Sequence, residues 1–133
     1  MTVRDNKGKI IPYINSDCIL RTADFFNTHS VFSLNEAARH LAPAGGRKGT
    51  VERLKYHLKI GRLKLVTRGF YAVVPYGVPV ESYQPDPFLV AAEVRPDGVF
   101  SYHSALELLG AAHSVWIRYT LYVTQRRRPL RLN

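Results

Sequence analysis

Residues 33–60 decide the fold, and they read SLNEAARHLAPAGGRKGTVERLKYHLKI. Ser33 and Glu36 have the spacing of a capping box, in which the serine hydroxyl accepts a hydrogen bond from the Glu36 backbone N–H and the Glu36 carboxylate reaches back. The box predicts a helix over residues 34–41, with one apolar stripe formed by Leu34, Ala37, Ala38 and Leu41. The proline and glycines of residues 43–46 then predict a turn.

A second helix is predicted after this turn. Gly49 or Thr50 caps its start, and Gly61 ends it after about residue 60. Its buried side is expected to consist of Val51, Leu54 and Leu58. Two apolar runs follow, and the glycine between them predicts a tight hairpin: Leu63–Thr67, Arg68-Gly69 and Phe70–Val74.

A further helix and a short strand are predicted upstream. The helix runs from a cap at Asn15 or Ser16 to about Thr28, with its core face formed by Ile19, Leu20, Ala23 and Phe26. Val31 and Phe32 suggest the strand. The order helix, strand, helix, turn, helix, hairpin is typical of a winged helix-turn-helix.

We therefore expect an α+β protein built around a winged helix-turn-helix. This DNA-binding domain covers residues 16–75 and follows a flexible N-terminal arm, residues 1–15. A linker, residues 76–85, leads to a small α/β segment over residues 86–133. Such a segment is too small for a core of useful size, so it either packs on the winged helix or belongs to a longer domain.

Local signals place the elements of the C-terminal segment. Asp86-Pro87 predicts a helix start, with the helix ending before Pro96. A strand is expected at Val99–Ser101, and Ser104 with Glu107 forms a second capping box for a short helix that Gly110 stops. The alternation of apolar and polar residues over Trp116–Thr124 predicts another strand.

The charge distribution favours a polyanionic partner. Nineteen Lys and Arg against ten Asp and Glu give a net charge of +9. Residues 1–74 hold 13 basic and five acidic side chains, whereas residues 75–133 hold six and five. A one-sided excess of this kind is typical of nucleic-acid binding. A membrane surface is less favoured, since no stretch pairs a basic face with large exposed apolar residues.

The second helix and the hairpin supply the expected DNA contacts. Arg53 is the predicted base reader, because a guanidinium group matches the two acceptors of guanine. The other expected contacts are Arg47, Lys48, Thr50, Tyr56, His57, Lys64, Thr67 and Arg68. Arg47 and Lys48 are expected just before the helix, where its dipole favours a phosphate. A solvated charged face is the alternative explanation for this basic run, and a lone histidine such as His57 is more often incidental.

No catalytic, cofactor or metal site is predicted. Residues 45–50 lack the Gly-Lys-Ser/Thr order of a phosphate loop. The five histidines share no ligand spacing, and the single Cys18, expected to be a buried helical residue, cannot by itself build a structural zinc site. Acidic residues do not cluster as catalytic pairs would. Tyr119 and Tyr122 are expected to pack in a sheet rather than stack on single-stranded bases.

The N-terminus has no apolar leader, and no run approaches ~18 consecutive apolar residues. We therefore expect a non-enzymatic, cytoplasmic protein without a membrane span.

Several motifs resemble those of AbiEi-type antitoxins, the transcriptional regulators of type IV toxin–antitoxin systems in phage defence. Those of the winged helix are Phe32-Ser-Leu-Asn-Glu-Ala-Ala38, Thr50-Val-Glu-Arg-Leu54, Gly61-Arg-Leu63 and Arg68-Gly-Phe-Tyr-Ala-Val-Val-Pro75. The similarity continues in Asp86-Pro-Phe-Leu-Val-Ala-Ala92, Tyr102-His-Ser-Ala-Leu-Glu-Leu-Leu-Gly110 and Tyr122-Val-Thr-Gln-Arg-Arg-Arg-Pro129.

The resemblance implies repression of the protein's own promoter through an operator, commonly an inverted repeat. It places the DNA contacts on Lys48, Thr50, Arg53, Tyr56 and Arg68. It also implies that residues 86–133 are the start of a second domain, one that normally runs on further in this family and counters a nucleotidyltransferase-like toxin. Two alternatives stay open: a winged-helix module that docks a toxin or another acidic partner without specific DNA binding, and a protein that binds RNA or single strands.

Overall fold

The computed structural model describes residues 3–4, 10–11, 16–41 and 45–132, with side chains from residue 19 onward. Within the predicted N-terminal arm, β1 (Val3–Arg4) pairs antiparallel with β2 (Ile10–Ile11). The rest of the arm, Asn15 as a cap, the side chain of Cys18 and residues 43–44 of the predicted turn lie outside the described part.

Three helices and three strands make up most of residues 16–73. They are α1 (Ser16–Thr28), β3 (Val31–Ser33), α2 (Leu34–Leu41), α3 (Gly46–Lys59), β4 (Leu63–Thr67) and β5 (Phe70–Val73). The strands form one antiparallel sheet in the order β3-β5-β4. Gly69 adopts a φ of +81° in the turn between β4 and β5, which confirms the predicted hairpin. The protein is therefore a mixed α+β fold.

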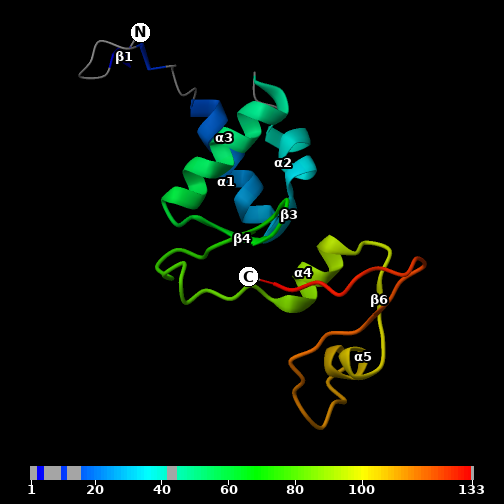
Figure 1. The fold of residues 1–133 in the computed structure, drawn as a ribbon. Helices are drawn as coiled ribbons and strands as arrows, with labels where there is room; N and C mark the ends of the chain where they lie inside the picture. The colour runs from blue at the N-terminus through cyan, green and yellow to red at the C-terminus, as the bar shows by residue number, and fades with distance from the viewer. Residues whose placement is uncertain (1–2, 5–9, 12–15, 42–44, 133) are drawn as a thin grey trace.

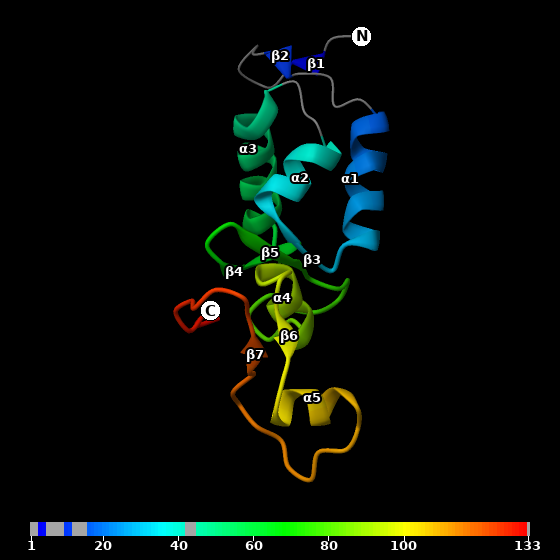
Figure 2. The same cartoon turned by 90° about the vertical axis from the view of Figure 1, so that its right-hand side faces the viewer.

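The sheet is covered on both faces. Figure 2 shows α1, α2 and α3 on one side of it and α4 (Pro87–Val94) on the other. Because side chains alternate along a strand, Phe32 faces the three helices whereas its neighbour Val31 faces α4. Ala72 and Val66 share that second face with Val90 of α4. The C-terminal segment is thus attached to the three-stranded sheet through α4, a short helix that covers this second face.

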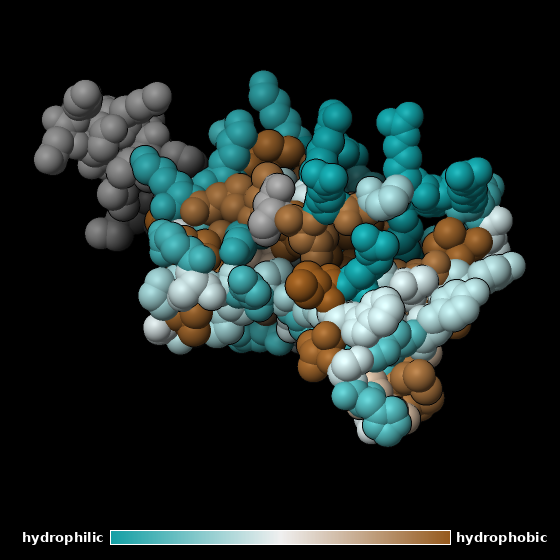
Figure 3. All heavy atoms as spheres, turned by 60° about the horizontal axis from the view of Figure 1, so that its bottom comes forward, coloured by the Kyte–Doolittle hydropathy of each residue, from teal (hydrophilic) through white to brown (hydrophobic). Residues whose placement is uncertain are grey.

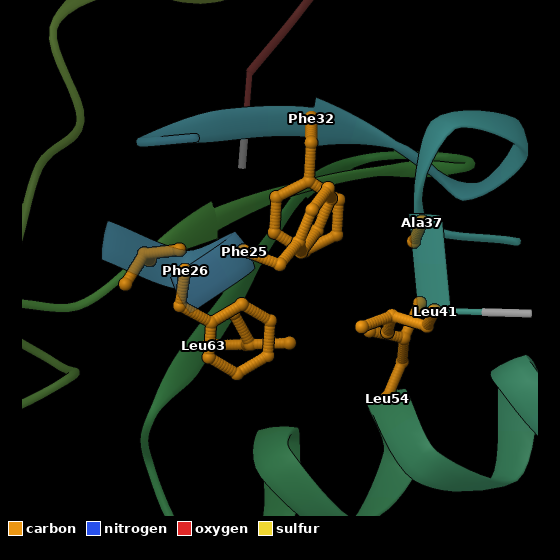
Figure 4. Close-up of a cluster of buried hydrophobic side chains, with 8 residues drawn as sticks. Phe25, Phe26, Phe32, Ala37, Leu41, Leu54 and Leu63 are labelled. Atoms are coloured by element: carbon orange, nitrogen blue, oxygen red, sulfur yellow. The ribbon is translucent and has the colours of Figure 1, made fainter. Parts of the chain in front are cut away.

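The main core lies between the sheet and the three helices. Phe32 is fully buried, with its ring centroid 4.9 Å from that of Phe25 and 5.9 Å from that of Phe26. Figure 4 shows Leu41 of α2 and Leu54 of α3 facing one another beside these rings. Residues from every element of the N-terminal half therefore meet in one cluster.

The helices α1 and α3 differ from the sequence prediction. In α1, Ile19 and Leu20 are exposed, and Phe25 is buried beside Phe26. α3 begins four residues before Thr50, at Gly46 after a Gly45 N-cap. Glycine disfavours a helix, but burial of Thr50 and Leu54 against α2 stabilises this first turn.

The buried side of α3 is also turned from the predicted one. Thr50 and Leu54 are fully buried, whereas Val51 is only partly covered. The difference amounts to roughly half of the ~100° that separates successive helical residues. It decides which polar side chains of α3 reach the surface.

The C-terminal segment is less regular than predicted. Asp86 accepts a hydrogen bond from the Phe88 N–H at 2.8 Å, and α4 ends before Pro96, as expected. Beyond it, β6 (Val99–Phe100) pairs with β7 (Leu121–Tyr122), and α5 covers His103–Leu108 (Figure 1).

Two predictions for this segment are wrong. The strand expected over Trp116–Thr124 is reduced to the two residues of β7, because β6 offers only two residues to pair with. Ser104 does not cap α5. Its hydroxyl is buried and accepts a hydrogen bond from the Thr120 N–H at 2.8 Å.

None of the helices in the described ranges combines the length and the apolar character that crossing a lipid bilayer requires.

Two leucines of β4 provide a test of the core. Leu63 is fully buried, whereas Leu65 on the same strand is 41% exposed. We expect Leu63→Ala to lower the free energy of unfolding by about 2–5 kcal/mol, because it removes buried methyl groups and leaves a cavity. Leu65→Ala should cost less than about 1 kcal/mol. Urea unfolding followed by circular dichroism measures both, and equal losses would contradict this arrangement of the strand.

Candidate nucleic-acid interface

The outer face of α3 carries a row of long polar side chains. We call the exposed residues of this face the α3 ridge: Arg47, Lys48, Glu52, Lys55, Tyr56 and Lys59. Four of the six are cations, and Tyr56 is 60% exposed. Figure 3 shows long hydrophilic side chains standing out along one edge of the molecule. A convex, positively charged helix face of this kind suits a polyanion.

Some of these cations are engaged within the protein. Arg47 donates to the side-chain oxygen of Asn35 at 2.7 Å, which connects α3 to α2. Lys55 donates to Glu52 at 2.9 Å, and this hydrogen bond and the charge of Lys55 lower the pKa of the Glu52 carboxyl. Among the residues that the structure describes, Lys48 and Lys59 form neither an ion pair nor a side-chain hydrogen bond. Their charges are therefore available to an outside partner.

The turn between β4 and β5 adds a further cation. Arg68 is exposed at its tip and makes no ion pair within the described ranges. The turn itself is fixed, because the Gly69 carbonyl accepts a hydrogen bond from the Leu34 N–H at the start of α2, at 2.8 Å. Thr67, just before it, is half-buried. Arg68 is thus presented from a turn that is tied to the helices.

Thr50 and Lys64 are not placed as predicted. The Thr50 side chain is fully buried and its hydroxyl donates to the Gly46 carbonyl at 3.1 Å, because it lies on the core side of α3. Lys64 is half-buried and donates to the Tyr83 carbonyl at 2.6 Å. Alternation along β4 directs Lys64 to the face that the segment after β5 crosses. Neither side chain is available to DNA in this structure.

His57 is packed rather than exposed. Its ring meets the Phe26 ring edge-on, with 4.9 Å between centroids, and its Nδ1 is buried without a hydrogen-bond partner in the described chain. Burial lowers the pKa of His57, and the positive charges of Arg53 and then Arg62 lower it further. The prediction of a surface histidine is wrong because the buried side of α3 includes this position.

Arg53 lies at the edge of the α3 ridge rather than at its centre. Its side chain is half-buried, and its Nη1 atom is enclosed without a hydrogen-bond partner among the described residues. The neighbouring cation Arg62 is also held: it donates to the Val74 carbonyl at 2.7 Å and lies 3.6 Å above the Tyr76 ring. Arg53 and Arg62 therefore add positive charge to this surface, but their side chains do not extend freely into solvent.

Sequence reasoning missed Lys55 and Lys59 as candidate contacts. The spacing of residues 48, 52, 55 and 59 is that of one helix face, and it identifies the ridge once the buried side of α3 is known. The sequence prediction took Val51, Leu54 and Leu58 as the buried side instead, which placed Lys59 at the edge of the polar face.

Two histidines that are distant in the sequence are brought together on the other side of α2. His29 and His40 have ring centroids 5.1 Å apart, with Glu36 beside them. The Glu36 N–H donates to the Ser33 hydroxyl at 3.2 Å, as the capping box predicts, but the Glu36 carboxylate turns to His29. The histidines share no ligand spacing along the sequence, yet the fold brings two of them together, because the β3 connection folds α1 against α2.

Glu93 of α4 lies next to this group. Burial raises the pKa of its carboxyl, and the neighbouring Glu36 raises it further. His29 and the Ser33 backbone N–H act in the opposite direction.

The other aromatic candidates differ in how they are packed. Tyr119 is half-buried and packs edge-on against Phe88, with 4.9 Å between ring centroids, whereas Tyr122 is exposed. The His103 ring stacks on Trp116 and lies 2.7 Å from the Ser114 carbonyl oxygen, so it orders the loop after α5.

The lowered pKa of His57 predicts a stability that depends on pH. The unfolded chain gains a proton near pH 6.5, which the folded chain resists, so stability falls as the pH drops from above 6.5 through the lower folded-state pKa. We expect His57→Gln to reduce the loss of Tm between about pH 7.5 and pH 5. His113→Gln, at an exposed position, should leave that loss unchanged. The same loss in H57Q as in the wild type would contradict a buried, neutral His57.

Comparison with known proteins assigns no family. No family model, curated protein or solved structure matches the chain. The resemblance to AbiEi-type antitoxins stays a prediction that depends on the quoted motifs.

Proposed function

We propose that this chain is a non-enzymatic, cytoplasmic transcriptional repressor that binds an operator in double-stranded DNA. The observation that carries the proposal is the α3 ridge, in which Lys48 and Lys59 are exposed and unpaired within the described chain. Between residues 47 and 68 the sequence holds eight basic side chains and one acidic one. An ordinary solvated face mixes both signs, whereas this surface has almost no balancing charge.

The order of elements supports a winged helix-turn-helix over residues 16–75. In that architecture α2 and α3 are the helix pair, α3 is the recognition helix, and the β4–β5 hairpin is the wing. The packing of α2 against α3 through Leu41 and Leu54 leaves the opposite face of α3 uncovered. That uncovered face is the α3 ridge.

We infer that some residues of this basic surface read bases and that others contact phosphates. Lys48, in the first turns, and Tyr56 are placed to meet base edges in the major groove. Lys59 and Arg68, at the two outer ends of the surface, are placed to contact phosphates, which fix orientation without reading sequence. Arg53 contributes to base reading only if its half-buried side chain turns outward.

Salt dependence tests the proposal. Four to six phosphate contacts give a slope of log K against log salt of roughly −4 to −5, so affinity for duplex DNA should fall roughly 250- to 1,000-fold between 50 and 200 mM salt. Replacing three exposed cations together, as Lys48→Gln, Lys59→Gln and Arg68→Gln, should reduce the slope by roughly 2 to 3. Fluorescence anisotropy with labelled duplexes measures both quantities.

A matched control removes the same charge elsewhere. Arg118, Arg126 and Arg127 are exposed in the C-terminal segment, and their replacement by Gln should leave the slope unchanged. If the two triple variants change the slope equally, net charge rather than the α3 ridge drives binding. No binding to duplex at low salt, or tighter binding to a single strand of the same sequence, would reject the proposal.

The resemblance to AbiEi-type antitoxins suggests that the repressed operator belongs to a toxin–antitoxin operon. A two-fold operator matches two copies of a helix-turn-helix spaced by about one helical turn of DNA. Selection of bound sequences from a random duplex library tests this, because an inverted repeat with that spacing is the expected product.

A protein-docking module is the second candidate function, favoured by one observation. The loop after α5 exposes three consecutive apolar residues, Val115, Trp116 and Ile117, and Ile117 is completely exposed. Exposed apolar groups of this kind mark protein contact sites. The partner that the resemblance suggests is a nucleotidyltransferase-like toxin.

A single substitution separates the two functions. We expect Ile117→Asp to weaken capture of a co-expressed nucleotidyltransferase-like toxin by roughly tenfold or more, because a buried charge is costly at an apolar contact. DNA affinity should stay unchanged. Arg118→Asp, at the next and equally exposed position, controls for charge. Capture that survives I117D would exclude this loop as the contact.

A further inference from the structure

Three potential metal-ligating side chains meet at the junction of α1 and α2. His29 follows the last residue of α1, while Glu36 and His40 lie four residues apart on α2 and hence on the same helix face. One ligand atom from each lies within 4.8 Å of the other two. The cluster lies apart from the α3 ridge and has no part in the proposed DNA contact.

The orientation of His29 is fixed by contacts behind its ring. The ring stacks on Phe25 with 4.4 Å between centroids, and Nδ1 lies 3.1 Å from the Phe25 carbonyl oxygen. Nδ1 also lies 2.8 Å from the Thr28 hydroxyl oxygen, which can donate to it. The tautomer in which Nδ1 instead donates to the Phe25 carbonyl leaves the Nε2 lone pair free for a metal ion. Metal-binding histidines typically have this backbone hydrogen bond, which sets the tautomer.

That lone pair faces a carboxylate. His29 Nε2 lies 3.6 Å from Glu36 Oε1, and the Glu93 carboxyl lies beside the same Glu36 side chain. With the His29 proton on Nδ1, the Nε2 lone pair and the Glu36 carboxylate are two facing acceptors that attract a cation between them. A tetrahedral zinc ion ~2.0 Å from each of two ligand atoms holds those atoms about 3.3 Å apart, close to the observed separation.

We propose that His29, Glu36 and His40 bind one divalent transition-metal ion of the zinc type. Two imidazole nitrogens and one carboxylate oxygen are a ligand set that suits Zn²⁺ and disfavours Mg²⁺, which prefers oxygen ligands throughout. His40 is exposed, so its ring adjusts readily to complete the coordination. Glu93 of α4 lies beside Glu36 and His29.

A proton on His29 Nε2 is the competing explanation, since an N–H that faces the carboxylate, with the Thr28 hydroxyl donating to Nδ1, also brings Nε2 near Glu36. Such a pair has no need of His40. The dependence of binding on His40 therefore separates the two explanations.

Occupation of the site would cross-link the end of α1 to α2, next to β3. Each ligand is anchored on an element of the main core, so the ion would stabilise the folded state and not the unfolded one. The expected role is structural, and it requires no change in the DNA-facing surface.

The experiment uses the full chain without a histidine tag, dialysed against a chelator and then supplied with ZnCl₂ or MgCl₂. We expect one zinc per chain by elemental analysis and a rise in Tm of roughly 10 °C when free Zn²⁺ is about a hundred times its Kd. Mg²⁺ should give no rise. Co²⁺ should give the visible absorption bands of a tetrahedral site.

The deciding variants are His40→Ala and His113→Ala. His40 and His113 are both exposed, so neither substitution should unfold the protein. His40→Ala should weaken zinc binding roughly tenfold or more and cut the rise in Tm at the same free Zn²⁺ to about half or less, whereas His113→Ala should bind zinc as the wild type does. No zinc bound by the wild type, equal binding in H40A, or equal weakening in both variants would overturn the proposal. DNA affinity measured alongside is independent of each outcome.

Discussion

The fully buried Phe32 ring joins the aromatic residues of α1 to the middle of the sheet. Phe32 lies on β3, a strand of only three residues that packs on both faces of the sheet. The adjacent Val31 points to the opposite face from Phe32 and meets α4. Backbone pairing of β3 with β5 fixes this register, with Phe32 opposite Tyr71. Burial of an aromatic ring is among the larger single contributions to a small core, and the helices take their positions from it.

The same strand connects the two candidate sites. β3 separates α1 from α2 by a short connection, so α1 folds back against α2 and brings His29 to Glu36. The packing of α2 on α3 then turns the polar face of α3 outward. The proposed DNA-facing surface and the proposed metal site therefore share one scaffold but involve different faces of α2.

The cations of the basic sequence stretch form two groups, those that donate hydrogen bonds within the protein and those that are exposed to solvent. Lys64, Arg62 and Arg47 belong to the same basic stretch of sequence, yet each donates a hydrogen bond inside the protein. Lys48, Lys59 and Arg68 keep their charges exposed. Charges held by internal acceptors still raise the local potential, but only exposed ones exchange water for phosphate oxygens.

Sequence by itself determined the local elements: the bounds of α1, the Ser33 cap, the hairpin at Gly69 and the Asp86 cap all follow from signals within a few residues. The rest was decided by contacts between residues far apart in the chain. Helical spacing restricts the buried face only to within about one residue step, so Thr50 and His57 were expected at the surface and lie against the core. His29 and His40 come from separate elements, and no spacing rule connects them. Only the packing of α1 on α2 places them side by side, because tertiary burial selects among faces that the sequence pattern leaves nearly equivalent.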